Sequence, residues 1–227
     1  MKMLYEGKTK DVYELPDGNC LLVFKDDATG TDGVFDPGAN TVGLRIDGIG
    51  ALNLRTSVYF FEELHNRGFA THYLSADIEA ASMTVRKAHV LGKGLEVICR
   101  YRAVGSFIRR YGAYIEEGAL LPAYVEITLK DDARGDPLIT GEALEALGIL
   151  DSPSYEQLKG LTQGICQVIK DLLKEKGLEL YDIKLEFGRA ENGEIMLIDE
   201  IASGSMRVFS DGVIVEPTAL TERILGD

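Results

Sequence analysis

Hydrophobic and polar residues alternate through the first part of the chain, the pattern that a half-buried β-strand produces. Alternating runs at residues 3–5, 11–14 and 20–25 are separated by a Pro-Asp-Gly-Asn turn at 16–19. Together they predict an antiparallel meander. Residues 26–50 are then rich in Gly and Asp without any period, which predicts a long loop.

Helical spacing appears twice further along the chain. Residues 53–67 carry apolar side chains three positions apart and end before Gly68, and residues 154–176 repeat apolar positions every three or four residues before Gly177. The second run predicts the most regular helix of the protein. Short helices are expected at residues 105–108, 140–147 and 217–225, and strands at residues 82–87, 95–101, 124–129, 180–187 and 194–201.

The order of these elements predicts an α+β protein with two lobes. An antiparallel, β-rich N-terminal lobe is expected over residues 1–98, and a mixed α/β C-terminal lobe over residues 99–227. A chain of 227 residues with 45% hydrophobic content can bury a core of this kind. The Gly-rich segment 30–50 is expected to act as a lid over a bound ligand.

Charge and cysteine usage narrow the classes of function. The 24 basic and 37 acidic residues give a net charge of −13, which repels nucleic acid and anionic membranes, so neither is expected as a partner. The three cysteines lie in apolar strings without paired spacing, which predicts buried, reduced thiols. No signal peptide or membrane-spanning window is visible, so a cytoplasmic location is expected. The sequence leaves open whether the chain acts alone or as a homo-oligomer.

The dipeptide Asn192-Gly193 predicts a tight β-hairpin, because Asn-Gly is strongly preferred in two-residue type I′ turns. If Glu191 pairs with Glu194, then Glu186 faces Asp199 directly across the hairpin. The opposite face then carries an apolar set suited to a core. That set consists of Ile183, Leu185, Phe187, Met196 and Ile198.

Two carboxylates opposite each other repel, and a divalent cation is a natural counter-ion for them. Mg²⁺ is typically held by one or two carboxylates, with nucleotide phosphates and water completing its shell. Asp182 and Lys184 are expected on the same face as Glu186 and Asp199, which favours a site. From the hairpin alone, a solvated surface ribbon without a metal explains the acids equally well.

Five sequence blocks, taken together, resemble the SAICAR synthetase family. Any one block is weak evidence, but five in the same order and spacing over nearly the whole chain make a chance resemblance improbable. The blocks are Tyr5-Glu6-Gly7-Lys8-Thr9-Lys10-Asp11-Val12-Tyr13, residues 96–106, Leu129-Lys130-Asp131-Asp132 with Asp136-Pro137, residues 180–188, and residues 199–207.

The resemblance implies an ATP site between the two lobes. Gly7, Lys8, Thr9 and Lys10 then form a nucleotide loop, in which Gly7 lets backbone N–H groups approach a phosphate. A lone Gly between charged residues is also typical of an ordinary hairpin turn. The remaining residues that the family implies for ATP are the backbone of Glu96 to Ile98 at the adenine, Lys130 as a neutralising charge, and Glu186 and Asp199 as ligands of Mg²⁺.

The resemblance also implies a site for an aminoimidazole carboxylate ribotide. Arg100 and Ser106 lie on either side of a Gly-containing turn that leads into a helix, where backbone N–H groups favour an anion. The family implies that Arg100, Ser106 and Arg207 hold the ribotide, with Asp182 and Lys184 near its base and carboxylate. Of these, Lys184, Asp182 and Arg207 are also the expected catalytic residues.

Several charged residues are left outside the expected site. Arg109 and Arg110 fit solvent-facing helix charges equally well. The histidines His65, His72 and His89 have no metal-ligand spacing and are interpreted as structural or surface residues.

The implied reaction is an ATP-dependent ligation that joins the ribotide carboxylate to the amine of L-aspartate in purine biosynthesis. ATP would phosphorylate the carboxylate and the amine would displace the phosphate. No general base can be named from the sequence.

Three departures from the family pattern limit what is implied about the substrates. Residues 202–204 read Ala-Ser-Gly instead of Ser-Pro-Asp, residues 47–53 lack a Lys and one Asn, and the part after Arg207 is short. Three alternatives stay open. The main one is a paralogue that uses the same chemistry on another carboxylate or amine. The others are a small-molecule kinase and a nucleotide-binding regulatory module without turnover, against which the charged residues at the matched positions argue.

Overall fold

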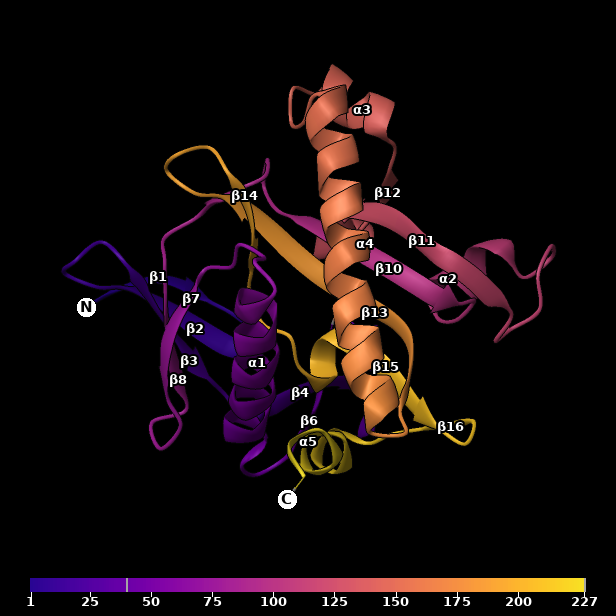
Figure 1. Ribbon diagram of the computed structural model, residues 1–227, viewed down its shortest axis with the longest axis horizontal. Coiled ribbons are helices and arrows are strands. Elements are labelled where there is room, and N and C mark those ends of the chain that lie inside the picture. The colour runs from indigo at the N-terminus through magenta and orange to yellow at the C-terminus, as the bar shows by residue number, and fades with distance from the viewer. Residues whose placement is uncertain (40, 227) are drawn as a thin grey trace.

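A computed structural model describes residues 1–39 and 41–226, and it has a mixed α+β fold with several antiparallel sheets (Figure 1). The first sheet contains the predicted meander, and α1 (Ile49–Asn66) packs on it with Phe60, Phe61 and Leu64 fully buried. Its strand order is β1-β2-β3-β8-β7. These strands are β1 (Lys2–Glu6), β2 (Lys10–Glu14), β3 (Cys20–Phe24), β7 (Tyr73–Asp77) and β8 (Ser82–Val85).

The second sheet is larger and forms the centre of the molecule. Its main path is β12-β11-β10-β13-β15-β16, with β14 and β9 also paired to β13. The strands are β9 (His89–Val90), β10 (Leu95–Arg102), β11 (Leu120–Leu129), β12 (Leu138–Ile139), β13 (Glu179–Arg189), β14 (Ile195–Ile198), β15 (Met206–Ser210) and β16 (Val213–Ile214).

The long helix predicted from apolar spacing is α4 (Ser152–Glu175), which crosses the face of this sheet over β10, β11 and β13 (Figure 1). The Asp151 side chain accepts the Ser154 N–H and caps its first turn. The remaining helices are α2 (Ser106–Tyr111), α3 (Gly141–Ala146), α5 (Pro217–Leu225) and the 3₁₀ turns Asp132–Arg134 and Ser203–Ser205. No helix in the described part of the chain is long and apolar enough to cross a membrane.

The prediction of a long loop at residues 26–50 is wrong. This segment forms a three-stranded sheet of order β5-β4-β6, from β4 (Asp27–Thr31), β5 (Val34–Phe35) and β6 (Val42–Arg45). Its glycines are needed for close backbone contact, because a Cβ at Gly30 would lie 2.1 Å from the Val34 carbonyl oxygen. The high glycine content of this segment therefore suggested a loop, although its residues form strands. Residue 40, in the expected lid, lies outside the described residues.

The predicted register of the Asn192-Gly193 hairpin is wrong by one residue. The loop has three residues, because the Ala190 N–H donates to the Glu194 carbonyl and Gly193 adopts a left-handed φ of 86°. Glu186 therefore faces Ile198, and Phe187 faces Leu197. The apolar core face is completed by Ile195 and Leu197, whereas the predicted Met196 and Ile198 lie on the other face.

The two acids nevertheless reach the same place. Asp199 follows the last residue of β14 and has a φ of 70°, outside the extended region. This break interrupts the strand alternation, and the Asp199 carboxylate lies with that of Glu186 in one pocket. A left-handed residue at a strand end thus compensates for the shifted register.

The chain passes from the first sheet to the second at residues 86–88, between β8 and β9. The predicted lobe boundary at residue 98 falls inside β10 and would cut the central sheet. The division into two lobes stays a prediction, although the passage between the two large sheets lies at residues 86–88. The three cysteines are buried and unpaired, as the sequence predicts.

Candidate active site

Two adjoining pockets contain nearly all of the charged residues that the sequence singles out. The first, which we call the lysine pocket, lies between the two large sheets and has a volume of about 350 Å³. It is lined by Tyr5, Gly7, Lys8, Thr9, Lys10, Val12, Cys20, Leu22, Thr29, Ala39, His72, Val85, Arg86, Ala88, Val90, Glu96, Lys130, Asp132, Lys184, Glu186, Ile198, Asp199, Glu200, Gly204 and Ser205.

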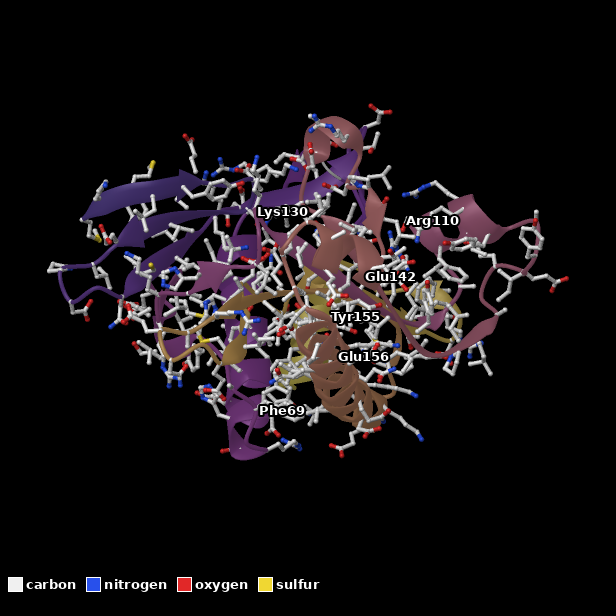
Figure 2. The ribbon with its side chains drawn as sticks, turned by 90° about the horizontal axis from the view of Figure 1, so that it is seen from above. Phe69, Arg110, Lys130, Glu142, Tyr155 and Glu156 are labelled. Atoms are coloured by element: carbon white, nitrogen blue, oxygen red, sulfur yellow. The ribbon has the colours of Figure 1, made fainter. Side chains whose placement is uncertain are left out.

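The second, which we call the arginine pocket, is smaller, at about 130 Å³. It shares Glu96, Lys184 and Ser205 with the lysine pocket. Figure 2 shows Lys130 of the lysine pocket and Arg110 of the arginine pocket lying apart from each other. The arginine pocket is lined by Pro37, Gly38, Glu96, Ile98, Arg100, Ser106, Arg109, Arg110, Thr128, Gly135, Asp136, Asp182, Lys184, Ser205, Met206 and Arg207.

Two lysines neutralise the acids of the lysine pocket. Lys10 lies 2.9 Å from Asp199 and 2.6 Å from Glu200, and Lys130 lies 2.6 Å from Glu186. Burial lowers the pKa of Lys10, but the Asp199 and Glu200 carboxylates outweigh it and hold that pKa well above its usual range. Burial likewise raises the pKa of Asp199, yet Lys10 and Lys130 bring it down to about 2.

The pKa of Glu186 is shifted in the opposite direction from that of Asp199. Burial raises the pKa of Glu186, and the negative charge of nearby Asp199 raises it further, against the opposing effect of Lys130. The two negatively charged carboxylates therefore repel each other in a site that is partly shielded from water. Such a pair gains from any additional positive charge that enters the pocket.

These carboxylates fit a magnesium ion that is shared with a phosphate ligand. Within residues 1–39 and 41–226, no group of three or more His, Cys, Asp or Glu side chains is arranged to hold a metal. Mg²⁺ does not require one, since it commonly takes one or two carboxylates and completes its shell with phosphates and water. Glu186 and Asp199 match that donor set.

The loop at residues 7–10 is a tight turn, because the Gly7 N–H donates to the Lys10 carbonyl at 3.0 Å. A Cβ at Gly7 would lie 2.5 Å from that oxygen, so only glycine fits. The Gly7 amide is thus used within the turn, and the approach of other backbone N–H groups of this loop to a phosphate stays a prediction. Lys8 extends to Asp132 at 2.6 Å, and the Thr9 hydroxyl lies 3.5 Å from Glu200.

One end of the lysine pocket is apolar. Val12 and Leu22 from the first sheet lie there with Val85, Ala88 and Ile198. The expected adenine contact through the backbone of Glu96 to Ile98 does not fit, because β10 pairs with β11 on one side and β13 on the other throughout this stretch. Ile98 lines the arginine pocket instead. The nearby linker at residues 86–88 lies outside the strands, so its backbone groups are better candidates for hydrogen bonds to adenine.

His72, which the sequence suggested was structural or exposed, supports the lysine pocket directly. The residue is 4% exposed, and its Nε2 lies 2.9 Å from the Asp199 carbonyl oxygen. Burial lowers the pKa of His72 to about 4, so the ring is neutral at neutral pH and donates to this carbonyl through Nε2. No sequence spacing announced this contact, because it joins residues that are far apart in the chain.

Arg100 is buried beneath the arginine pocket with every donor in use. Its Nε and Nη2 donate to Glu126, its Nη2 also to Ser106, and its Nη1 to Asp182 and to the Val104 carbonyl. A guanidinium has five N–H donors, so none is left over. A direct contact between Arg100 and a ligand anion therefore requires one of these bonds to break. As the structure stands, Arg100 orients Ser106 and Asp182.

Arg207 keeps donors available to a ligand. Its Nη1 donates to Asp182 at 2.9 Å and its Nη2 to Asp36 at 3.0 Å. Gly38 and Gly105 approach the guanidinium so closely that a Cβ at either would lie within 3 Å of it. Burial raises the pKa of Asp182 despite its two arginine neighbours. The same burial lowers the pKa of Arg207, but Asp182 and Asp36 raise it by more.

Arg109 and Arg110, which the sequence left outside the site, both line the arginine pocket. Arg110 forms an ion pair with Glu126, whereas the side chain of Arg109 forms no ion pair or hydrogen bond with any described residue. Arg109 lies three residues after Ser106 in α2, so both side chains share one face of the helix. That spacing was the signal in the sequence that identifies Arg109.

The fold and the two pockets define an α+β protein with two adjoining cavities lined by basic side chains, a lining suited to anionic small molecules. The family model for SAICAR synthetase matches residues 3–216. A phosphoribosylaminoimidazole-succinocarboxamide synthase from Clostridium tetani is 56% identical over 226 residues, which cover 99% of this chain and all of the relative. The chain belongs to the SAICAR synthetase family.

Solved structures agree with this assignment. A SAICAR synthetase described as a complex with ADP has a TM-score of 0.87 and 30% identity, covering all of this chain and 98% of that one. A SAICAR synthetase from Pyrococcus horikoshii has a TM-score of 0.83 and 28% identity, with 96% and 98% coverage. The fold and the family therefore agree along almost the full length of the chain.

Proposed function

We propose that the chain is an ATP-dependent ligase that condenses carboxyaminoimidazole ribotide with L-aspartate to give SAICAR, ADP and phosphate in purine biosynthesis. The phosphoribosylaminoimidazole-succinocarboxamide synthase from Clostridium tetani matches this chain over its whole length, and the SAICAR synthetase family model supports the same activity. The observation that carries the proposal is the junction of the two pockets at Glu96, Lys184 and Ser205. A phosphoryl group can pass there from one ligand to the other without leaving the protein.

ATP is assigned to the lysine pocket, an assignment supported by the 30% identical neighbour described as an ADP complex. Lys8, Lys10 and Lys130 supply positive charge for the phosphates, as phosphoryl transfer requires. The base is assigned to the apolar end, next to the linker at residues 86–88. Glu96 and Ile98 are no longer assigned to adenine, because β10 has no free edge there.

Glu186 and Asp199 are the proposed ligands of Mg²⁺. When bound, the ion neutralises phosphate charge and orients the transferred group. Lys10 and Lys130 now lie against these carboxylates, so they can turn toward ATP phosphates when a cation takes their place. The like-charge coupling between Glu186 and Asp199 supports this exchange.

The ribotide is assigned to the arginine pocket. Ser106, Arg109 and Arg207 are the proposed contacts for its anionic groups, since each lines the pocket and the Arg109 guanidinium has no protein partner among the described residues. Arg100 supports them from below through Ser106 and Asp182. Lys184, at the junction, is placed to orient the carboxylate that becomes phosphorylated.

Catalysis then rests on positioning and charge. The ribotide carboxylate attacks the terminal phosphorus of ATP and forms an acyl phosphate, and ADP leaves. The aspartate amine displaces phosphate from that intermediate. Phosphoryl transfer asks for little covalent chemistry from the protein, so the arrangement of charged side chains provides the main contribution.

Purified protein tests the assignment directly. Incubation with Mg-ATP, carboxyaminoimidazole ribotide and L-aspartate should release ADP and phosphate in equal amounts with the succinocarboxamide product, detected by mass spectrometry. Replacing aspartate with glutamate or asparagine should remove the product. ADP release that ignores the amine, or a stable phosphorylated product without an amide, would contradict the ligase and favour a kinase.

A further inference from the structure

Glu96 has a position that no other described carboxylate shares, because it alone lines both the lysine pocket and the arginine pocket. Its side chain is 9% exposed and is held at both oxygens. Lys184 donates to Oε1 at 2.7 Å, and the Thr128 hydroxyl donates to Oε2 at 3.0 Å. Each carboxylate oxygen can accept two hydrogen bonds, so Glu96 is fixed in place and can still accept another.

The other acids around the two pockets are committed elsewhere. Asp182 is held by both Arg100 and Arg207. Glu186 and Asp199 are paired with lysines and are the proposed metal ligands. Asp136 lines the arginine pocket but not the lysine pocket, and its Oδ1 accepts a hydrogen bond from the Asp131 N–H at 2.8 Å. Glu96 is the carboxylate left with acceptor capacity where the two ligands meet.

Amide formation needs such a group. As the nitrogen lone pair of the neutral aspartate amine bonds to the acyl carbon, the carbon–oxygen bond to phosphate breaks and its electron pair stays with the phosphate. The nitrogen must then lose a proton to become an amide nitrogen. A positioned side chain that takes a proton in this way contributes about 10²- to 10⁴-fold to a rate.

We propose that Glu96 binds the attacking aspartate amine and accepts its proton, a role that rests on the function proposed above. The proton passes from nitrogen to a Glu96 oxygen and then to the departing phosphate, which restores the carboxylate and balances the reaction. Lys184 holds the two partners together. One of its three N–H donors binds Glu96, and the others remain for the ribotide carboxylate.

The charge of Lys184 suits this role. Lys184 forms an ion pair with the Glu96 carboxylate at 2.7 Å, and this negative charge favours the protonated amine. The side chain therefore stays an ammonium. It orients the acceptor carboxylate and leaves the proton transfer to Glu96.

The test compares two nucleophiles in Glu96→Gln, which keeps the size of the side chain and one accepting oxygen for Lys184, while its amide can donate to the Thr128 hydroxyl and cannot take the proton. Hydroxylamine is unprotonated at neutral pH and attacks acyl phosphates without a base, giving a hydroxamate. The variant should lose about 10²- to 10⁴-fold in amide formation with aspartate while forming hydroxamate close to the wild-type rate. Glu156→Gln, an exposed residue on α4 outside both pockets, is the matched control and should keep both reactions.

Each outcome decides the matter. Equal loss with both nucleophiles would assign Glu96 to phosphoryl transfer or binding, and full activity with both would make it a spectator, so either result overturns the proposal. A wild-type protein that makes neither amide nor hydroxamate would refute the proposed function instead. If Glu96→Gln does not fold, Glu96→Asp keeps a carboxylate one methylene short. It should show the same selective loss in aspartate turnover, and equal loss with hydroxylamine would again refute the role.

Discussion

At the scale of single residues, buried charge and burial itself set most of the chemistry. Lys10 and Lys130 form ion pairs with Asp199 and Glu186 in a partly dry pocket, and His72, as a neutral ring, donates to the Asp199 carbonyl. The lysines and acids were predictable because each lies in a sequence block with its own physical interpretation. The roles of His72 and Arg109 were missed, since burial and pocket lining depend on distant parts of the chain.

His72 gives a prediction for stability against pH. The folded state holds its pKa at about 4, below the usual 6.5, so its contribution is fully present above pH 6.5 and is lost as the pH falls toward 4. Without magnesium or nucleotide, the unfolding free energy should fall by about 2 kcal/mol from pH 7 to pH 5 through this residue. Urea titrations of the wild type and His72→Gln measure it.

The His72→Gln variant distinguishes the pH dependence caused by His72 from that caused by the carboxylates. His72→Gln keeps a side-chain donor for the Asp199 carbonyl, and the slope between pH 7 and pH 5 should become shallower by the share of His72, while that of His65, whose pKa burial also lowers, remains. His89, an exposed residue on β9, provides the comparison, and His89→Gln should retain the slope. An unchanged slope in His72→Gln would show that another group is responsible.

At the scale of elements, the segment between β5 and β6 connects the two pockets. Pro37 and Gly38 line the arginine pocket, and Ala39 lines the lysine pocket. Asp36 contacts Arg207 at 3.0 Å, so it occupies a guanidinium that the proposed ribotide site uses. The expected lid therefore has a specific contact, although its closure stays a prediction.

Removing that contact should strengthen ribotide binding. Asp36 is 46% exposed, and an ion pair of this kind contributes at most about 1 kcal/mol, so Asp36→Ala should lower the KM for the ribotide by about 2- to 5-fold. The KM for ATP should change little. Asp47→Ala, at a fully exposed acid of the same segment, is the control. A raised ribotide KM in Asp36→Ala would mean that the contact assembles the site instead of competing with the substrate.

Helix α4 and the hairpin at residues 190–194 differ in how far the sequence predicts them. Helix α4 was predictable because its apolar spacing is a local property. The hairpin register was not, because Asn-Gly also suits a three-residue loop in which Gly193 takes the left-handed position. The convergence of the two acids then depended on the positive φ of Asp199, which the residue pattern does not announce.

At the scale of the whole molecule, the order of strands within the central sheet was out of reach. β10 and β13 are neighbours although 76 or more residues separate them, and this pairing brings Glu96, Lys184 and Glu186 together. Sequence blocks predicted which residues matter, but only the sheet shows that Glu96 lies between two ligands. The same sheet excludes the adenine contact that the blocks implied.

Helix α1 joins the first sheet to the segment that carries the acids. The Ser57 hydroxyl lies 2.9 Å from the Asn53 carbonyl oxygen and 3.1 Å from that of Ile201, and the Ile201 N–H donates back to it at 3.3 Å. Ser203 donates to the Asn53 side chain at 2.7 Å. These buried contacts fix residues 201–203 directly after Asp199 and Glu200. The position of the acids therefore depends on a helix that packs on the other sheet.

Ser57→Ala tests this connection. It leaves the buried N–H of Ile201 without that partner, so the unfolding free energy should fall by about 1–3 kcal/mol. The KM for ATP should rise, because the acids that follow β14 lose their support. The double variant Thr56→Val with Thr221→Val removes both partners of a neighbouring buried hydroxyl pair and should be nearly neutral. Calorimetry with ATP and urea titrations would reveal whether stability and nucleotide affinity fall together in Ser57→Ala. If stability alone falls, α1 supports the fold without setting the geometry of the site.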